Sequence, residues 1–101
     1  MEIKSESNFT EIINSDYALI DFYATWCGPC KMLAPILENI ESSRDNIKIA
    51  KVDVDKYEFL AKQYGVMSIP TLILFKNGQI VDKKIGFIAE PLLVDWINNN
   101  R

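Results

Sequence analysis

The segment from Tyr17 to Tyr23 is apolar throughout except for Asp21. A strand that is apolar on both faces is typical of the centre of a parallel sheet, because helices cover such a strand from both sides. Ile47–Val54 and Thr71–Phe75 are predicted to be two further core strands. We therefore expect a chain built around one buried sheet.

The segments between these strands carry helical signals. Asp55 and Glu58 form a variant of the capping box, which predicts that a short helix begins there and is closed by Gly65. After the first strand, apolar residues recur at helical spacing at Met32, Leu33, Ile36, Leu37 and Ile40. The predicted helices are Asn8–Asn14, capped by Ser7 or Asn8, Cys27 to about Ser43, Asp55–Gly65, and Glu90 to Ile97.

Asn77 and Gly78 separate the third predicted strand from Gln79–Ile85. Both residues tolerate the positive φ of a type I′ turn, so the two strands are expected to form an antiparallel hairpin. Strands that alternate with helices, and then a hairpin and a last helix, predict an α/β fold. Its central mixed sheet would be flanked by helices on both faces, in a single domain over residues 1–101.

Charge and hydropathy exclude some classes of partner. The chain has 11 basic and 14 acidic residues and a formal net charge of −3, which disfavours nucleic acid and anionic membranes as partners. No apolar stretch is long enough to span a bilayer, and the first residues lack the basic start and apolar run of a secretory signal. We expect a cytoplasmic protein, in which a disulfide serves redox chemistry better than permanent cross-linking.

Cys27 and Cys30 are the only cysteines, and the chain has no histidine. They belong to the segment Trp26-Cys-Gly-Pro-Cys30, where the first strand is expected to turn into a helix. A close pair of thiols without other soft ligands suits a two-electron dithiol–disulfide couple better than a zinc site, which needs two more Cys or His ligands. A metal shared between two chains remains an alternative.

The two cysteines are expected to differ in reactivity. Cys27 stands at or just before the first helical turn, where free N–H groups and the helix dipole stabilise a thiolate, so it is the predicted nucleophile. Cys30 lies one turn further in, where burial favours a neutral thiol until this residue attacks Cys27 as the resolving group. Between them, Pro29 stiffens the ring and Gly28 keeps one side open for a partner's backbone.

A carboxylate is the leading candidate for the group that takes the proton from Cys30, since histidine is absent. Asp21 is flanked by apolar residues, and burial there would raise its pKa towards neutrality. Lys51 is expected on the same strand face as Ile47 and Ile49, where it would pair with Asp21 and temper that rise. Each residue also has an ordinary alternative: Asp21 as a hydrogen-bonded strand residue, and Lys51 as a lysine that reaches solvent.

These residues, together with several other short motifs, resemble the thioredoxin family from about Asn8 to Ile97. The matching motifs, in the family's order, are Asp21-Phe22, Trp26-Cys-Gly-Pro-Cys30, Ala34-Pro35, Ala50-Lys-Val-Asp53, Ile69-Pro-Thr71, Phe75-Lys-Asn-Gly78 and Gly86. The resemblance implies a thioredoxin fold and a monomeric protein-disulfide reductase without a bound cofactor. Electrons would come from NADPH through a flavoprotein, thioredoxin reductase, and pass to disulfides of target proteins.

The resemblance also implies roles for individual residues. Asp21 and Lys51 match the family's buried acid and its lysine, and Ile69-Pro70 matches its cis peptide, which faces the cysteines and leaves the Ile69 backbone free for strand addition by a partner. The flat apolar docking surface corresponds to Trp26, Val54, Ser68, Ile69, Ile85 and Gly86. The chain departs from the family's pattern at two positions. Tyr23 stands where many members have a tryptophan, which would change fluorescence and local packing. Ser68 stands where glycine, alanine or threonine is more usual, which would affect the choice of partner.

A second functional class stays open, namely a non-catalytic module that binds a partner protein in either redox state. Replacement of both Cys27 and Cys30 by serine separates the two classes, because only the redox function needs the thiols. Within the redox class, an oxidase or isomerase is disfavoured by the lack of a signal sequence and of a histidine between the cysteines.

Overall fold

The computed structural model describes residues 1–43 and 46–101. Within these ranges one mixed sheet has the strand order β2-β1-β3-β4, and none of the helices is both long and apolar enough to cross a membrane. The strands are β1 Ala18–Tyr23, β2 Lys48–Asp53, β3 Thr71–Lys76 and β4 Gln79–Ile85. The helices are α1 Glu6–Ile13, α2 Gly28–Ser42, α3 Glu58–Gln63 and α4 Glu90–Asn99.

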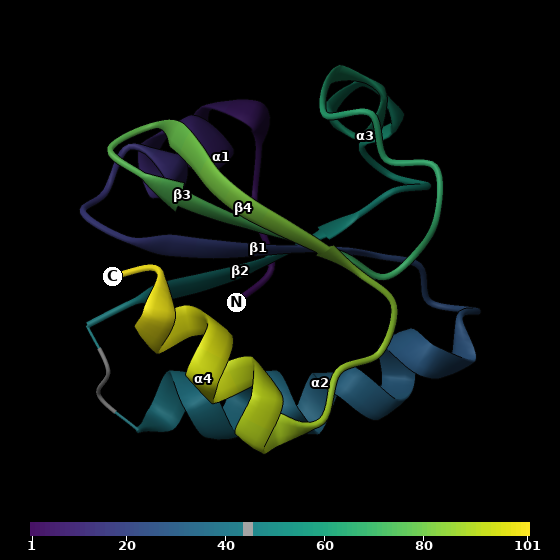
Figure 1. Ribbon diagram of the computed structural model, residues 1–101. Helices are drawn as coiled ribbons and strands as arrows, with labels where there is room; N and C mark the ends of the chain where they lie inside the picture. Colours follow the sequence, from purple (N-terminus) through teal and green to yellow (C-terminus); the bar gives the residue numbers. More distant parts are fainter. Residues whose placement is uncertain (44–45) are drawn as a thin grey trace.

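The sheet lies between two layers of helices, with α1 and α3 on one face and α2 and α4 on the other (Figure 1). β1 occupies the interior of the sheet, parallel to β2 and antiparallel to β3. Ala18, Ile20 and Phe22 pack towards α1 and α3, whereas Leu19 packs towards α2 and α4. The predicted α/β fold is therefore confirmed, and burial from both sides explains why β1 is apolar at consecutive positions.

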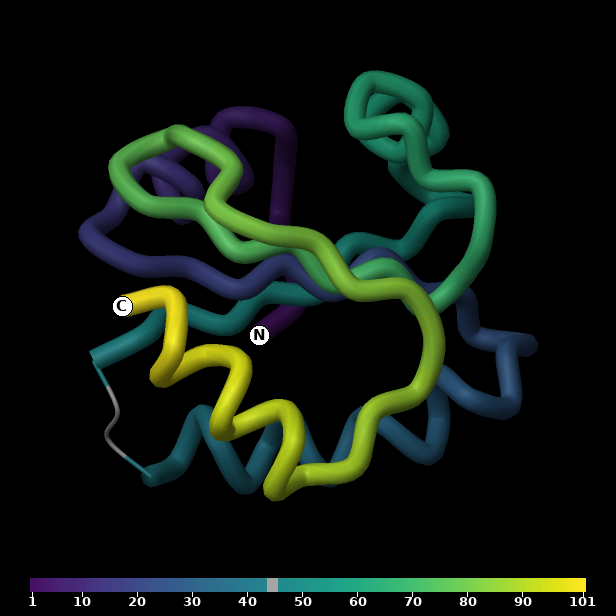
Figure 2. The backbone as a smooth tube through the Cα atoms, in the orientation of Figure 1, coloured from purple at the N-terminus to yellow at the C-terminus, as the bar shows by residue number. Residues whose placement is uncertain are grey.

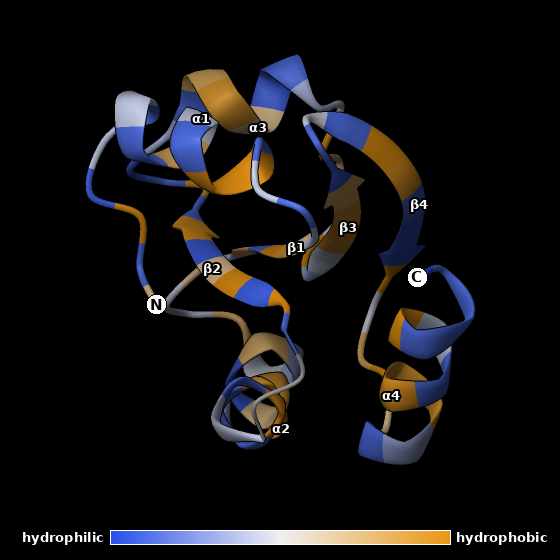
Figure 3. Cartoon of the chain, turned by 90° about the vertical axis from the view of Figure 1, so that its left-hand side faces the viewer, coloured by the Kyte–Doolittle hydropathy of each residue, from blue (hydrophilic) through white to orange (hydrophobic). Residues whose placement is uncertain are grey.

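The hairpin prediction is confirmed as well. Asn77 and Gly78 have φ values of 49° and 84°, and they join β3 to an antiparallel β4. β3 is apolar along nearly its whole length, while β4 mixes apolar and polar residues and is exposed along its length (Figure 3). β4 therefore forms the outer edge of the sheet.

Two helix starts differ from the predictions. α1 begins at Glu6, because the hydroxyl of Ser5 caps it by accepting the backbone N–H of Asn8 at 3.0 Å. Neighbouring Ser and Asn residues are nearly equal as caps, so the sequence did not choose among them. α3 begins at Glu58 without a side-chain cap, because residues 54–56 form a turn that is closed by the N–H of Tyr57, which donates to the Asp53 carbonyl. The predicted capping box at Asp55 is wrong.

α2 begins where the Cys motif placed it and buries most of its repeating apolar positions. Leu33, Leu37 and Ile40 are buried and Ile36 is half-buried, but Met32 is 61% exposed. Met32 lies beyond Ile36 around the helix, past the border of the stripe that faces the sheet. Its expected place in the apolar repeat is therefore wrong.

Residues before α1 lie along β2, which is the other edge strand of the sheet. Glu2 forms an isolated parallel bridge with Lys51. The N–H of Ile3 donates to the Lys51 carbonyl at 3.1 Å, and the N–H of Lys51 donates to the Met1 carbonyl at 2.7 Å. Figure 2 shows this segment rising from the sheet to α1. The backbone of β2 is thus partly paired on its outer side.

Candidate active site

Cys27 and Cys30 form a disulfide at the N-terminus of α2, with their Cα atoms 5.2 Å apart. Cys27 is the N-cap of the helix, and its sulfur accepts the backbone N–H of Cys30 at 3.2 Å. Pro29 stands in the first turn, where a missing N–H costs no hydrogen bond. A Cβ added at Gly28 would meet no atom within 4 Å, so this side of the disulfide ring is open as expected.

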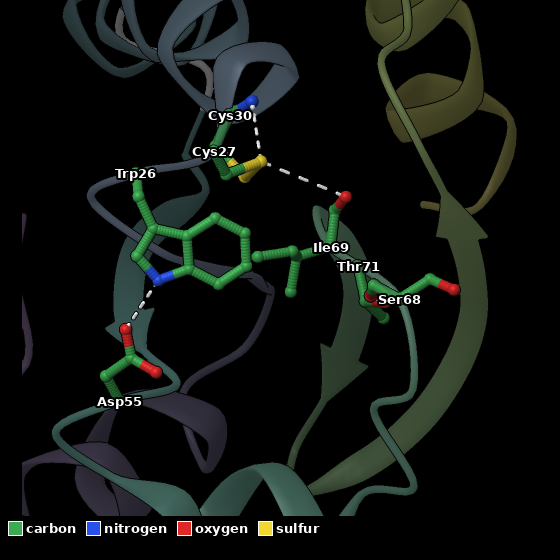
Figure 4. The surroundings of a disulfide bond; sticks show 7 residues. All are labelled: Trp26, Cys27, Cys30, Asp55, Ser68, Ile69 and Thr71. Carbon is green, nitrogen blue, oxygen red and sulfur yellow. Dashed lines mark hydrogen bonds between the residues drawn. A yellow bond between two sulfur atoms is a disulfide. The ribbon is translucent and has the colours of Figure 1, made fainter.

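The surroundings of the two sulfurs differ more than their exposure does. Cys27 is 5% exposed and Cys30 is 3% exposed, so the expected contrast between an outer and an inner residue is small in the disulfide state. Cys27 Sγ also lies 3.9 Å from the carbonyl oxygen of Ile69 (Figure 4). A disulfide sulfur carries no proton to donate, so here this is a contact, whereas a Cys27 thiol could donate to the same oxygen.

The Ile69–Pro70 peptide is cis, in line with the resemblance. Pro70 is buried, and Ile69 packs against the cluster that contains both cysteines. The Pro70 carbonyl accepts the N–H of Gly86 at 2.8 Å, which fixes the end of β4 beside the cis peptide. Gly86 has a φ of 93°, a conformation that favours glycine.

Trp26, Val54, Ser68 and Ile69 line a hollow of about 210 Å³ together with Val66 and Met67. Val54 and Ile69 pack against the cysteines, so the hollow adjoins the disulfide. Ile85 pairs with Thr71 at the end of β4 and is 66% exposed. The structure thus brings all six predicted docking residues to the end of the sheet that carries the cysteines.

Sequence reasoning missed three residues at this site: Asp55, Val66 and Met67. The indole Nε1 of Trp26 donates to Asp55 Oδ2 at 2.8 Å, which holds the 68% exposed ring in place beside the hollow (Figure 4). Met67 is 95% exposed at the rim of the hollow. These residues lie within two positions of Val54 or Ser68 in the sequence, and this proximity to predicted docking residues could have identified them.

Asp21 is fully buried, and neither of its carboxylate oxygens has a hydrogen-bond partner. Burial raises the pKa of Asp21 to about 7; the positive charge of Lys51 lowers it and the negative charge of Glu2 raises it. A buried carboxyl with no partner is unusual, because loss of hydration then stays uncompensated. The expected burial of Asp21 and its raised pKa are both present in the structure.

Lys51 is half-buried and lies opposite Asp21 in the register of β1 and β2. Its Nζ lies 4.2 Å from the centroid of the Tyr23 ring. In the described part of the chain no salt bridge joins Lys51 to Asp21, so the expected ion pair is not formed. Lys51 acts on Asp21 through its charge, at longer range.

The arrangement can exchange disulfides with another molecule. It combines a Cys pair at a helix N-terminus, an apolar hollow beside the sulfurs, and a buried acid whose pKa lies near neutrality. Among the described residues, no three His, Cys, Asp or Glu side chains gather into a group that could hold a metal ion.

The thioredoxin family model matches residues 1–99. The chain is 54% identical to the thioredoxin of Staphylococcus haemolyticus over 95% of this chain and 93% of that one. It is 46% identical to the thioredoxin of Chlamydia caviae over 99% of this chain and 98% of that one. A mutant thioredoxin from Halobacterium salinarum has a similar structure, with a TM-score of 0.92 and 37% identity over 99% of this chain and 88% of that one. The chain therefore belongs to the thioredoxin family of thiol–disulfide oxidoreductases.

Proposed function

We propose that this protein reduces disulfides of target proteins in the cytoplasm as a monomer, and that a flavoprotein thioredoxin reductase returns the electrons from NADPH. The observation that carries the proposal is the Cys27–Cys30 disulfide at the N-terminus of α2, beside the open space at Gly28. The family membership supports the same reaction. No bound cofactor takes part, because the two sulfurs themselves hold the electron pair.

The first step belongs to Cys27. In the dithiol form its thiolate attacks one sulfur of a target disulfide, a new S–S bond forms, and the other target sulfur leaves as a thiolate. The N-cap position supports this role, since the sulfur accepts the Cys30 N–H and lies at the positive end of the α2 dipole. Both effects stabilise the thiolate over the thiol.

The second step belongs to Cys30 and Asp21. Cys30 gives its proton to Asp21, and the resulting thiolate attacks Cys27. The bond between Cys27 and the target breaks, the target leaves with both sulfurs reduced, and the Cys27–Cys30 disulfide forms. A pKa of about 7 lets Asp21 accept this proton and release it again near neutral pH.

The docking surface would orient the target protein and its disulfide. Val54 and Ile69 pack against the cysteines, Trp26 and Ser68 line the adjoining hollow, and the Ile69 carbonyl is directed at Cys27 (Figure 4). Ile85 ends β4, and the N–H of the next residue, Gly86, donates to the Pro70 carbonyl. An extended segment of the target would pair with the Ile69 backbone and place its disulfide against Cys27. Pro29 would restrict the backbone on the cysteine side of this contact, and the cis Pro70 would restrict it on the Ile69 side.

One assay tests the reaction as a whole. We expect NADPH oxidation when the protein, a thioredoxin reductase and a disulfide-bonded substrate protein are combined, and none when Cys27 and Cys30 are both replaced by serine. Free thiols on the substrate confirm that the electrons reach it. If the doubly substituted protein instead keeps its function in the host pathway, the protein is a binding module and not a reductase.

Asp21→Asn is expected to slow the resolving step at neutral pH, because the amide cannot take the proton from Cys30. A loss of roughly a hundred- to ten-thousandfold is the size expected for removal of a general base. Single-turnover decay of a preformed mixed disulfide measures this step directly, and circular dichroism checks that the variant is folded. An unchanged decay rate at pH 7 would remove Asp21 from the mechanism.

A further inference from the structure

The N-terminal segment is fixed to the edge of β2 by bonds on both sides of Glu2. The Met1 amino group donates to the Ile49 carbonyl at 3.0 Å and pairs with Glu41 at 3.2 Å. Lys51 exchanges backbone hydrogen bonds with Met1 and Ile3. These contacts hold Glu2 beside Lys51 of β2. Lys51 in turn lies opposite Asp21 of β1.

The side chain of Glu2 is held too. Its carboxylate accepts a hydrogen bond from the hydroxyl of Tyr23. Burial, together with this bond to Glu2, raises the pKa of Tyr23 well above its ordinary value, so the hydroxyl stays protonated and remains a donor. Lys51 Nζ lies over the same ring at 4.2 Å. Glu2, Tyr23 and Lys51 therefore form one polar group, which we call the Glu2 cluster.

Tyr23 and Lys51 of the Glu2 cluster lie on the same face of the sheet as Asp21. Asp21 and Tyr23 are two residues apart on β1 and share one face of the sheet, which Lys51 of β2 also shares. A hollow of about 290 Å³ is lined by both Glu2 and Lys51, and Asp21, which lies opposite Lys51 on β1, is fully buried. The cluster thus places polar and charged side chains next to the strand position that carries the buried carboxyl.

The charges around Asp21 are few. Lys51 contributes a positive charge from β2, and Glu2 contributes a negative charge from the N-terminal segment. β3 presents the uncharged Leu72 opposite Asp21, and α2 contributes Glu38 and Glu41 at the rim of the hollow. The Met1 amino group pairs with Glu41, and Asp53 of β2 lies opposite Tyr23. Tyr23 is neutral. Among these negative groups, Glu2 is the one whose charge acts on Asp21 against that of Lys51.

We propose that Glu2 is a positioning residue for Asp21: the N-terminal segment and the Tyr23 hydroxyl fix its carboxylate beside Lys51, where it offsets the lysine and keeps Asp21 able to hold the Cys30 proton. The part that concerns Cys30 rests on the proposed function. The electrostatic part stands on the contacts of the Glu2 cluster alone. The proton passes from Cys30 to Asp21 and then to solvent, and no other reactant is needed.

The test is a direct titration of Asp21 in the oxidised protein, where the cysteines do not ionise, by the ¹³C shift of its carboxyl carbon. Glu2→Gln removes the charge but keeps an oxygen for the Tyr23 hydroxyl. We expect the midpoint of Asp21 to fall by at least a few tenths of a pH unit, as for loss of a nearby partly solvated charge. Glu11→Gln, an equal charge change on α1 at the opposite face of the sheet, is the matched control and should leave the midpoint in place.

Tyr23→Phe provides a second variant, which frees the Glu2 side chain without changing any charge. A fall in the titration midpoint of Asp21 that is smaller than in Glu2→Gln would support the role of the Tyr23 hydroxyl in holding the Glu2 carboxylate. Equal midpoints in Glu2→Gln and the unmodified protein would overturn the proposal, as would an equal fall in Glu11→Gln.

The pH profile of the resolving step separates this proposal from the proposed function. If the midpoint and the profile both move in Glu2→Gln, Glu2 acts on the reaction through Asp21. If the midpoint moves and the profile stays, the effect of Glu2 on Asp21 stands, and the role of Asp21 as the proton acceptor of Cys30 fails.

Discussion

Cys30→Ser is expected to accumulate a covalent adduct with target proteins through Cys27 and to lose multiple-turnover activity by two or more orders of magnitude. The substitution leaves the α2 N-cap and the Cys30 backbone N–H in place, so Cys27 keeps the groups that stabilise its thiolate. The first exchange step then proceeds, but no second sulfur is available to break the mixed disulfide. Non-reducing gels and mass spectrometry of the adduct measure both the trapping and the site of attachment.

Cys27→Ser is the matched control for this experiment. It removes the sulfur at the N-cap and leaves only Cys30, which lies within the first turn of α2 and not at the N-cap position that stabilises a thiolate. We expect little or no adduct from this variant. Equal trapping by the two variants would mean that the attacking and resolving roles are assigned the wrong way round.

Asp21→Asn is expected to make the oxidised protein more stable at pH 8, by up to about 4 kcal/mol. The folded protein raises the pKa of Asp21 from 3.8 to about 7, so the folded state binds this proton more tightly than the unfolded chain. Stability from this group is therefore fully present below about pH 4 and is lost as the pH rises to about 7. The separation of the two pKa values corresponds to about 4 kcal/mol, which is the upper limit of the expected effect.

Urea unfolding of the oxidised protein from pH 4 to pH 8 measures this difference. The gap between Asp21→Asn and the unmodified protein should widen with pH and level off above about pH 7. Asp16→Asn, at an exposed position, shows the background effect of such a replacement. A gap that stays constant with pH would mean that Asp21 is ionised in the folded protein at all of these pH values.

The fold could be predicted because its main signals are local. The consecutive apolar residues of β1, the Asn77-Gly78 turn and the Cys motif each specify their structure within a few positions. The start of α1 was less certain, since Ser5, Ser7 and Asn8 can all serve as caps and tertiary packing decides among them.

The contacts of the site were harder to predict, because they join residues distant in the sequence. Asp55 reads as a helix cap in its own segment, and only the folded chain brings it to the indole of Trp26. Asp21 and Lys51 lie opposite each other on neighbouring strands, so their expected proximity is present. The alternation of residues along a strand could not predict that the Lys51 ammonium lies over the Tyr23 ring and not at the Asp21 carboxylate. The bond from Tyr23 to Glu2 has no local signal at all.

The exposed outer strand β4 also bears on how the molecule behaves in concentrated solution. Among the described residues the outer side of β4 pairs with no other strand, and such an edge can add an extended chain, which is the usual start of strand-by-strand stacking between copies. Lys83 and Lys84 follow one another along this edge, and Asp82 is held by the indole of Trp96 at 2.7 Å. Two copies that meet along β4 would bring paired lysines together, so repulsion of like charge should keep the protein dispersed and slow its aggregation.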